Sequence, residues 1–165
     1  MLSEAERRLH RCSFTGHRPE RLRQSEYEVK TALEKEILRA IAEGFTVFIS
    51  GMARGVDIWA AEIVLRLRDA GQPIRLICAS PYCGFEQGWK ESWKWKYSAI
   101  MRSADLIRFI SSQYNRTCFQ ARNEWMVDHS AKVIAVYNGS PGGTRNTICY
   151  ARKKGVAVSV ITCEQ

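Results

Sequence analysis

Six short apolar runs of strand length constrain the fold of this chain more than any other feature. They lie at about 12 to 15, 45 to 50, 73 to 79, 105 to 111, 132 to 137 and 156 to 162. Several are rich in Val, Ile and Phe, as is typical of strands buried on both faces. Because stretches with helical spacing alternate with these runs, the sequence predicts an α/β fold with a mostly parallel sheet of about six strands and helices on both faces.

The intervening stretches carry helix signals. In residues 25 to 44, Ser25 and Glu28 form a candidate capping box, and a glycine ends the apolar periodicity. The stretch from about 55 to 69 has one apolar face on which Glu62 is a lone carboxylate. A third helix is expected over residues 119 to 130, before the fifth strand.

Length and composition indicate one globular domain over residues 1 to 165. With 45% hydrophobic residues, the chain can bury a substantial core, and it contains no internal repeat or linker. No apolar stretch approaches the roughly 18 residues that span a bilayer, and the N-terminal stretch is charged. We therefore expect a soluble, cytoplasmic protein without a membrane partner.

Cysteine and charge patterns narrow the chemistry. The cysteines form no C-x-x-C pair and most lie in or beside apolar runs, which favours buried reduced thiols over a metal site or disulfide framework. They are Cys12, Cys78, Cys83, Cys118, Cys149 and Cys163. The net charge is +8, and arginines are concentrated in the first 23 residues. This excess favours anionic partners, although a solvated basic face explains it equally well.

Three glycine-bearing loops follow the first, second and fifth predicted strands. Their sequences are FTGHRPERL, SGMARGVD and YNGSPGGTRNT. In a parallel sheet these loops meet at one edge, where ligands bind, and two of them run into a predicted helix whose free N–H groups suit an anion. Arg18 offers a bidentate contact to a phosphate, and Thr15, Ser50, Thr144 and Thr147 offer hydroxyls. The loops together predict a phosphate-binding edge, although ordinary turn and cap chemistry explains each hydroxyl alone.

Aromatic residues recur every four positions in the stretch FEQGWKESWKWKY. Phe85, Trp89, Trp93 and Tyr97 would form one face of a helix. Such a face either stacks on the base of a nucleotide or packs as core against the sheet, and the second interpretation is favoured.

His17 lies in the first glycine loop and has two open roles. Nothing in the sequence pairs it with a carboxylate, so a phosphate-binding or turn-stabilising role is favoured over general acid or base catalysis. Arg122 and Asn123 lie in the first half of the third helix, from which they can reach the same edge.

The motifs FTGHRP, FISGMARGVDIWAAEIVL and ARNEWMVDHSAKVIAVYNGSPGGTRNTICYARKKG occur in this order over nearly the whole chain. Together they resemble the YpsA-like branch of the SLOG superfamily, which is named for DprA/Smf and LOG proteins. The resemblance implies a Rossmann-like three-layer sandwich that binds a nucleotide or a derivative such as NAD or ADP-ribose. It implies a pocket formed by Gly16, His17, Arg18, Ser50, Gly51, Met52, Ala53, Gly55, Asp57, Glu62, Arg122, Asn123, Gly142, Gly143 and Thr144.

The resemblance leaves activity and partners open. LOG enzymes cleave nucleoside-phosphate N-glycosidic bonds with a helix arginine, which Arg122 resembles, and a glutamate, whose place Thr147 takes here. Because that cleavage normally needs a carboxylate, a binding and sensing role is favoured over hydrolysis, unless Asp57 or Glu62 substitutes. The segment SGMARGVD also resembles DprA, which implies single-stranded DNA as a less favoured partner. Relatives in the superfamily often pair, so a homodimer is expected.

Overall fold

The computed structural model describes residues 1–164, which form an α/β domain around one six-stranded sheet. The strands are β1 (Arg11–Gly16), β2 (Val47–Ser50), β3 (Arg75–Tyr82), β4 (Leu106–Ser111), β5 (Lys132–Tyr137) and β6 (Ala157–Thr162). The helices are α1 (Glu4–Arg8), α2 (Glu26–Ala42), α3 (Val56–Asp69), α4 (Glu91–Ser103), α5 (Cys118–Asp128) and α6 (Gly143–Lys153), with a 3-10 turn η1 (Pro19–Arg21). Every predicted strand is present.

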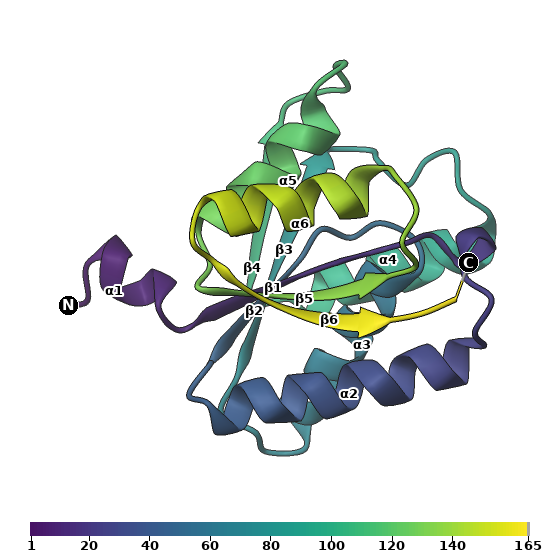
Figure 1. The fold of residues 1–165 in the computed structure, drawn as a ribbon. Helices are drawn as coiled ribbons and strands as arrows, with labels where there is room; N and C mark the ends of the chain where they lie inside the picture. The colour runs from purple at the N-terminus through teal and green to yellow at the C-terminus, as the bar shows by residue number, and fades with distance from the viewer. Residues whose placement is uncertain (165) are drawn as a thin grey trace.

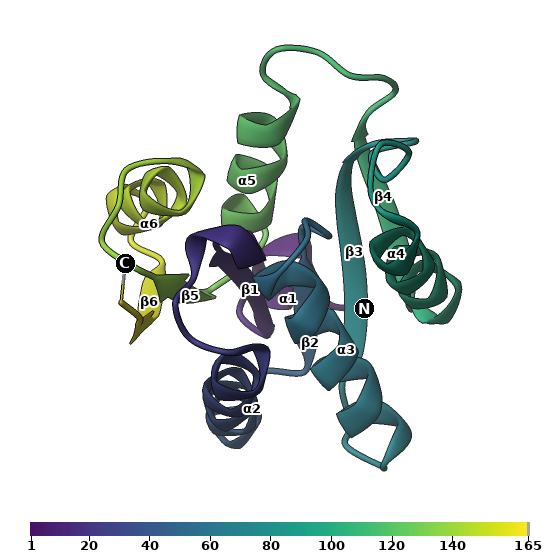
Figure 2. The same ribbon diagram turned by 90° about the vertical axis from the view of Figure 1, so that its right-hand side faces the viewer.

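The sheet is entirely parallel, and its strand order is β4-β3-β2-β1-β5-β6. Helices α2, α3 and α4 cover one face, and α5 and α6 cover the other (Figures 1 and 2). The chain therefore has the predicted Rossmann-like three-layer sandwich, because each strand returns to the sheet through a crossover helix.

The expected capping box of α2 is present. The side chain of Ser25 accepts a hydrogen bond from the Glu28 N–H, and the Glu28 carboxylate accepts one from the Ser25 N–H at 2.8 Å. Leu33 and Ile37 on the apolar face of α2 are fully buried against the sheet and α3. The helix thus begins where its cap satisfies free N–H groups and lies where its apolar stripe is covered.

The aromatic stretch does not form one continuous helix. Residues 83–89 form turns, and α4 begins only at Glu91, so Phe85 and Trp89 precede the helix. Tyr97 is buried in the core, and Trp93 packs against the core beside Trp59, with ring centroids 6.2 Å apart. The core interpretation is therefore correct for the α4 residues but not for Phe85.

Buried residues form a large cluster between the sheet and the α2 to α4 layer, and smaller clusters under α5 and α6. Cys12, Cys78, Cys118 and Cys163 are buried, whereas Cys83 and Cys149 are exposed, which corrects the expectation for those two thiols. In the part of the chain that the structure describes, no helix is long and apolar enough to cross a membrane.

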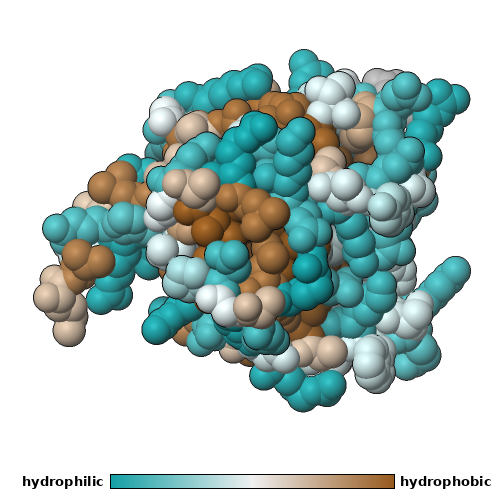
Figure 3. All heavy atoms as spheres, turned by 90° about the horizontal axis from the view of Figure 1, so that it is seen from below, coloured by the Kyte–Doolittle hydropathy of each residue, from teal (hydrophilic) through white to brown (hydrophobic). Residues whose placement is uncertain are grey.

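Ion pairs lie on the outer surface of the α2 and α3 layer. Arg66 of α3 pairs with Glu34 of α2 at 2.8 Å, and Lys30 pairs with Glu26 within α2 at 3.0 Å. Seen from this side, the molecule is mostly hydrophilic around an apolar area in the middle of the face (Figure 3). The ion pairs are partly solvent-exposed, so burial of the inner stripe contributes more to stability.

Two leucines of α2 test this division. Leu33 is fully buried and Leu38 is 41% exposed. We expect Leu33→Ala to lower the free energy of unfolding by about 2 to 5 kcal/mol, because it leaves a cavity in the core. Leu38→Ala should cost no more than about 0.5 to 1 kcal/mol. Urea denaturation of both variants measures the difference, and similar losses would contradict the burial of this stripe.

Candidate functional site

The candidate site lies where the winding of the sheet reverses. Strands β2 to β4 follow β1 on one side, and β5 and β6 lie on its other side, so the loops after β2, β1 and β5 are neighbours. A cavity of about 370 Å³ opens at this carboxyl edge. In open α/β sheets, this reversal is the usual place for a ligand, and the cavity is of the usual ligand-site size.

The cavity brings together much of the expected site. Of the fifteen residues expected from the sequence, nine line it, namely Gly16, His17, Arg18, Ala53, Asp57, Arg122, Asn123, Gly143 and Thr144. Further lining residues are Phe14, Thr15, Arg21, Phe85 and Phe119. The walls therefore come from the β1, β2 and β5 loops, from α5, and from the turns after β3.

His17 fastens the β1 loop to the β5 loop. Its Nε2 accepts a hydrogen bond from the backbone N–H of Asn138 at 3.2 Å. The side-chain Nδ2 of Asn138 donates to the Arg21 carbonyl at 2.9 Å. Burial, together with the nearby charge of Arg21, lowers the pKa of His17. A neutral ring with its proton on Nδ1 fits these contacts, and through Nε2 His17 joins the two loops at the cavity wall.

The β2 loop is held in a strained shape. Met52 is a buried non-glycine residue with a φ of 64°, a left-handed conformation that costs about 1 to 2 kcal/mol. Ser50 Oγ accepts a hydrogen bond from the Met52 N–H at 3.2 Å and donates to the Asp57 carbonyl at 2.8 Å. Ser50 and Met52 thus shape the loop from behind, and neither lines the cavity.

The glycines at positions 51 and 55 make room for other parts of the protein. A Cβ on Gly55, where φ is 91°, would lie 2.7 Å from the His17 carbonyl oxygen. A Cβ on Gly51 would lie 2.9 Å from Arg122 Nη1 and 3.0 Å from Asp57 Oδ2. Both are closer than a real side chain allows, so these glycines let the loops and Arg122 pack together.

Arg122 and Asp57 form the charged centre of the site. The Arg122 guanidinium reaches from α5 to donate to the Gly51 carbonyl through Nη1 and to Asn123 Oδ1 through Nε, the latter at 2.8 Å. Its side chain is buried, which lowers its pKa against the opposing effect of the Asp57 charge. A buried guanidinium keeps its charge, so it is a fixed positive group at the cavity wall.

Asp57 has one oxygen engaged and one free. Its Oδ2 accepts a hydrogen bond from the Ala53 N–H at 3.2 Å, whereas Oδ1 is buried without a partner among the described residues. Burial raises the pKa of Asp57 to about 6, although the Arg122 charge and the Ala53 N–H oppose this. An unpartnered buried acceptor is costly, and a ligand hydroxyl would relieve that cost.

The β5 side of the cavity is formed by the start of α6. Gly142 is the N-cap residue, and no side chain among residues 1–164 caps this helix. Gly143 and Thr144 line the cavity. Arg21 lies at the same wall and donates to Ser140 Oγ at 2.8 Å and to the Pro141 carbonyl at 3.2 Å. A helix start without a side-chain cap, next to arginines, suits an anionic group.

Aromatic rings form the wall on the β3 side. The rings of Phe85 and Phe119 both line the cavity, with centroids 5.6 Å apart. Tyr82 and Tyr114 pack behind Phe119, at centroid distances of 6.4 and 6.2 Å. A flat ring system entering the cavity would therefore meet a preformed aromatic surface.

Six expected residues lie outside the cavity lining. Ser50, Gly51, Met52, Gly55 and Gly142 lie directly behind it and shape its loops. Glu62 lies on α3, where it faces Lys96 of α4 at 3.9 Å and lines a different cavity between α2 and α3. Thr147 also lies outside, and its hydroxyl donates to the Gly143 carbonyl at 2.9 Å.

Sequence reasoning left Phe14, Arg21 and Phe119 out of the expected site. Phe119 precedes Arg122 by three residues, a spacing that places both on one helix face, so this position was open to inference. Phe85 was expected to stack only as part of a helix, but it lies in the turns before α4, which begins at Glu91. The place of Arg21 depends on η1, a turn that the apolar periodicity does not reveal.

Comparison with known proteins gives the family of this chain. The sequence profile described as the YspA SLOG family, named YpsA, matches residues 12–164, nearly the whole chain. The chain belongs to this family. Among the curated relatives of this chain is a UPF0398 protein of Halalkalibacterium halodurans, 30% identical over 128 residues, which span 76% of this chain and 68% of the relative. A UPF0398 protein of Bacillus thuringiensis is 30% identical over 131 residues, 77% of this chain and 71% of that protein.

Solved structures of DNA processing protein A have the same fold as this YpsA-family chain. The Helicobacter pylori protein, described with a single-stranded DNA binding mode, aligns with a TM-score of 0.64 at 20% identity over 95% of this chain. The Streptococcus pneumoniae protein aligns with a TM-score of 0.67 at 20% identity over 92% of it. The chain spans 66% and 50% of the lengths of those two structures, so the likeness concerns one part of each.

The close packing at Gly55 can be tested against a matched glycine. Gly44 also has a positive φ, of 101°, but no atom lies near the Cβ that alanine would add. We expect Gly44→Ala to cost about 1 to 2 kcal/mol of unfolding free energy from backbone strain alone. Gly55→Ala should cost about 1 to 3 kcal/mol more, because its Cβ overlaps the His17 carbonyl. Equal losses in urea denaturation would contradict the packing role.

The raised pKa of Asp57 predicts a pH-dependent stability. The folded protein holds the Asp57 proton up to about pH 6, whereas the unfolded chain releases it near 3.8. Stability from this group is therefore complete below the lower value and is lost as pH rises through 6, by up to about 3 kcal/mol. We expect the unfolding free energy of Asp57→Asn, measured relative to the wild type by urea denaturation, to rise by this amount from pH 3.5 to pH 7.5. A difference that stays constant with pH would show that Asp57 titrates normally.

Proposed function

We propose that the cavity binds a nucleotide or a nucleotide derivative such as NAD or ADP-ribose, and that this YpsA-family chain senses the ligand rather than turning it over. The observation that carries the proposal is the free Asp57 Oδ1 in the same cavity as the buried Arg122 guanidinium. This pair offers an acceptor and donors to one polar ligand. A buried carboxylate is costly to ionise, and such a group in a cavity is typical of a ligand-binding site.

The ribose is assigned to Asp57. A ribose hydroxyl donating to Asp57 Oδ1 would satisfy the atom that lacks a partner among the described residues. Leaving such an acceptor unsatisfied costs about 1 to 3 kcal/mol, so the contact would contribute on this scale. A phosphate at this oxygen is disfavoured because both groups carry negative charge.

The phosphate is assigned to Arg18 and the start of α6. Arg18 is exposed at the rim of the cavity, and in the described part of the chain no side chain caps Gly143 and Thr144 in the first turn of the helix. A charge-assisted hydrogen bond contributes about 1.5 to 3 kcal/mol, and a helix N-terminus about 0.3 to 1 kcal/mol. These contributions together reach only about millimolar affinity before association costs.

The base is assigned to the wall formed by Phe85 and Phe119. Stacking of a base on an aromatic side chain contributes about 1 to 3 kcal/mol, which is comparable to the phosphate contacts. A ligand that combines base, ribose and phosphate should therefore bind at least about ten times more tightly than inorganic phosphate.

Calorimetric titration tests the proposal with ADP-ribose, NAD, AMP and inorganic phosphate. We expect saturable binding of at least one nucleotide. Phe85→Leu should weaken it about tenfold by removing the stacking surface while leaving the phosphate affinity unchanged. Glu62→Gln is the matched control, because Glu62 lies outside the cavity, and it should bind like the wild type. Absence of binding by every nucleotide at millimolar concentration would sink the proposal.

Hydrolysis of a nucleoside phosphate is the second candidate, and the state of Asp57 favours it. A carboxyl with a pKa of about 6 is suited to general acid or base catalysis near neutral pH. Asp57 would then replace the LOG glutamate. Thr147 occupies the position of that glutamate, and its hydroxyl donates a hydrogen bond to the Gly143 carbonyl. We propose sensing first, so AMP incubated with the protein should release no adenine. Adenine release that Asp57→Asn abolishes would establish the enzyme instead.

Single-stranded DNA binding is the third candidate. It rests on the shared fold with DNA processing protein A and on the exposed Arg18 and Arg21 at the cavity. The cavity volume of about 370 Å³ suits one nucleotide better than a strand. An oligothymidylate that bound more tightly than AMP, with affinity falling steeply as salt rises, would place this function first.

A further inference from the structure

Strand β4 leaves the outer edge of the sheet open. It is the last strand in the order, and its hydrogen-bonded neighbour is β3. Leu106, Ile107 and Phe109 on this strand are 43%, 38% and 44% exposed. An exposed edge with apolar side chains and no proline is a template for another strand.

Two cavities beside β4 form a groove at the end of the sheet opposite the candidate site. Their volumes are about 350 and 380 Å³, and they share lining residues that include Arg7 and Leu106. We call them together the basic groove, after the side chains that carry its chemistry. These are Arg7, Arg75, Arg108, Leu106, Phe109 and Trp125.

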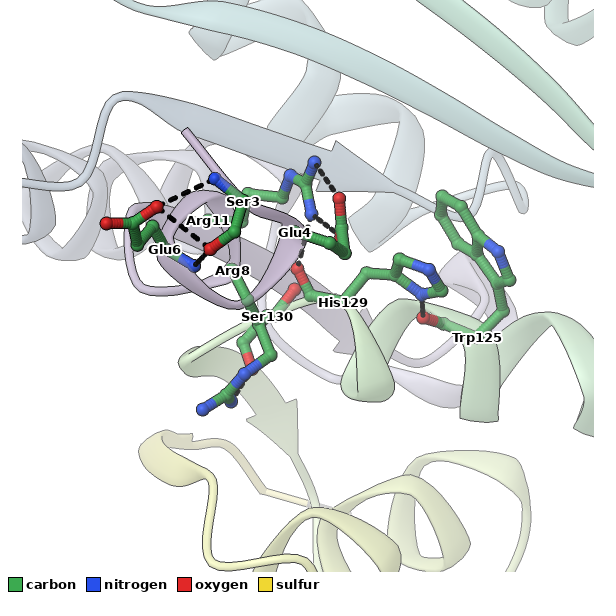
Figure 4. Close-up of polar contacts among 8 residues, drawn as sticks. All are labelled: Ser3, Glu4, Glu6, Arg8, Arg11, Trp125, His129 and Ser130. Carbon is green, nitrogen blue, oxygen red and sulfur yellow. Dashed lines mark hydrogen bonds and ion pairs between the residues drawn. The ribbon is translucent and has the colours of Figure 1, made fainter. Parts of the chain in front are cut away.

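The short helix α1 forms the rim of the basic groove. No α1 residue is buried, and the helix stands away from the sheet (Figure 1). It is held by polar contacts, since Glu4 pairs with Arg11 and the Arg8 guanidinium donates to the Ser130 carbonyl at 2.9 Å (Figure 4). Beneath it, the rings of Trp125 and His129 stack with centroids 4.2 Å apart.

The groove carries an excess of positive charge. Its acidic residues are already engaged, because Glu4 pairs with Arg11 and Asp105 pairs with Arg68 at 2.8 Å. Within residues 1–164, Arg7, Arg75 and Arg108 form no ion pair. Three cationic groups therefore surround an apolar surface next to an open strand edge.

We propose that the basic groove and the outer edge of β4 bind an extended acidic segment of a partner protein, which adds to the sheet as a further strand. The open peptide groups of β4 would pair with the segment backbone. Alternate side chains of a strand lie on opposite faces, so its apolar side chains would pack on Ile107 and Phe109. The side chains between them would lie on the face of Arg108 and Trp125. Its carboxylates would face the arginines of the groove.

Two other occupants fit the groove less well. A second copy of the chain would bring a net charge of +8 and would set the same arginines against one another across a two-fold axis. A nucleic acid strand would use the arginines but would leave the peptide groups of β4 and much of its apolar surface without a matching partner. An acidic peptide is complementary to all three features.

Fluorescence anisotropy on the full chain tests the proposal with a labelled eight-residue peptide of alternating glutamate and valine. We expect saturable binding to the wild type and at least a tenfold loss of affinity in Arg108→Glu. The control Arg102→Glu makes the same charge change at an exposed position on α4, and it should stay within twofold of the wild type. As a second measurement on the wild type, bound peptide should slow amide exchange of residues 106–111.

Three results would overturn the proposal. The first is equal binding of a peptide in which lysine replaces glutamate. The second is an oligothymidylate that binds the groove more tightly than the acidic peptide and is lost in Arg108→Glu. The third is a homodimer in sedimentation equilibrium that Phe109→Lys dissociates, which would assign the edge to a second copy. The candidate nucleotide site lies at the other end of the sheet, so its titrations succeed or fail independently.

Discussion

The contact between the Arg122 guanidinium and the Gly51 carbonyl is the interaction on which the candidate site depends. It joins α5, on one face of the sheet, to the loop after β2, and it places a fixed positive charge beside Asp57. Gly51 has no side chain, and the absence of a Cβ leaves the space that Arg122 occupies. Burial of both charged groups is unfavourable by itself, so the protein maintains a polar cavity at an energetic cost.

Much of the fold was predictable because a parallel sheet has a strong sequence signature. Buried parallel strands read as short apolar runs, and crossover helices read as amphipathic stretches between them. The capping box of Ser25 and Glu28 marked the start of α2 to the residue. The gathering of the β1, β2 and β5 loops also followed from topology, since parallel strands end at one edge.

The features of the site that the sequence did not predict depend on contacts between distant segments. Gly55 was expected to admit a ligand, but the atom that approaches it is the His17 carbonyl oxygen, from the loop after β1. Glu62 has the chemistry of a catalytic carboxylate, yet the rotation of α3 turns it toward Lys96 and away from the cavity. Phe85 reaches the cavity from a turn rather than from a helix. Periodicity reports local structure, and none of these three placements is local.

The central claim is that one nucleotide occupies the cavity with its base on the aromatic wall and its ribose at Asp57. A crystal structure of the protein grown with AMP tests it most directly. We expect density for the base against Phe85 and Phe119, a ribose hydroxyl within hydrogen-bond distance of Asp57 Oδ1, and the phosphate at Arg18 and the start of α6. Ordered AMP at another place on the molecule, or a cavity that contains only water at saturating AMP, would contradict the account.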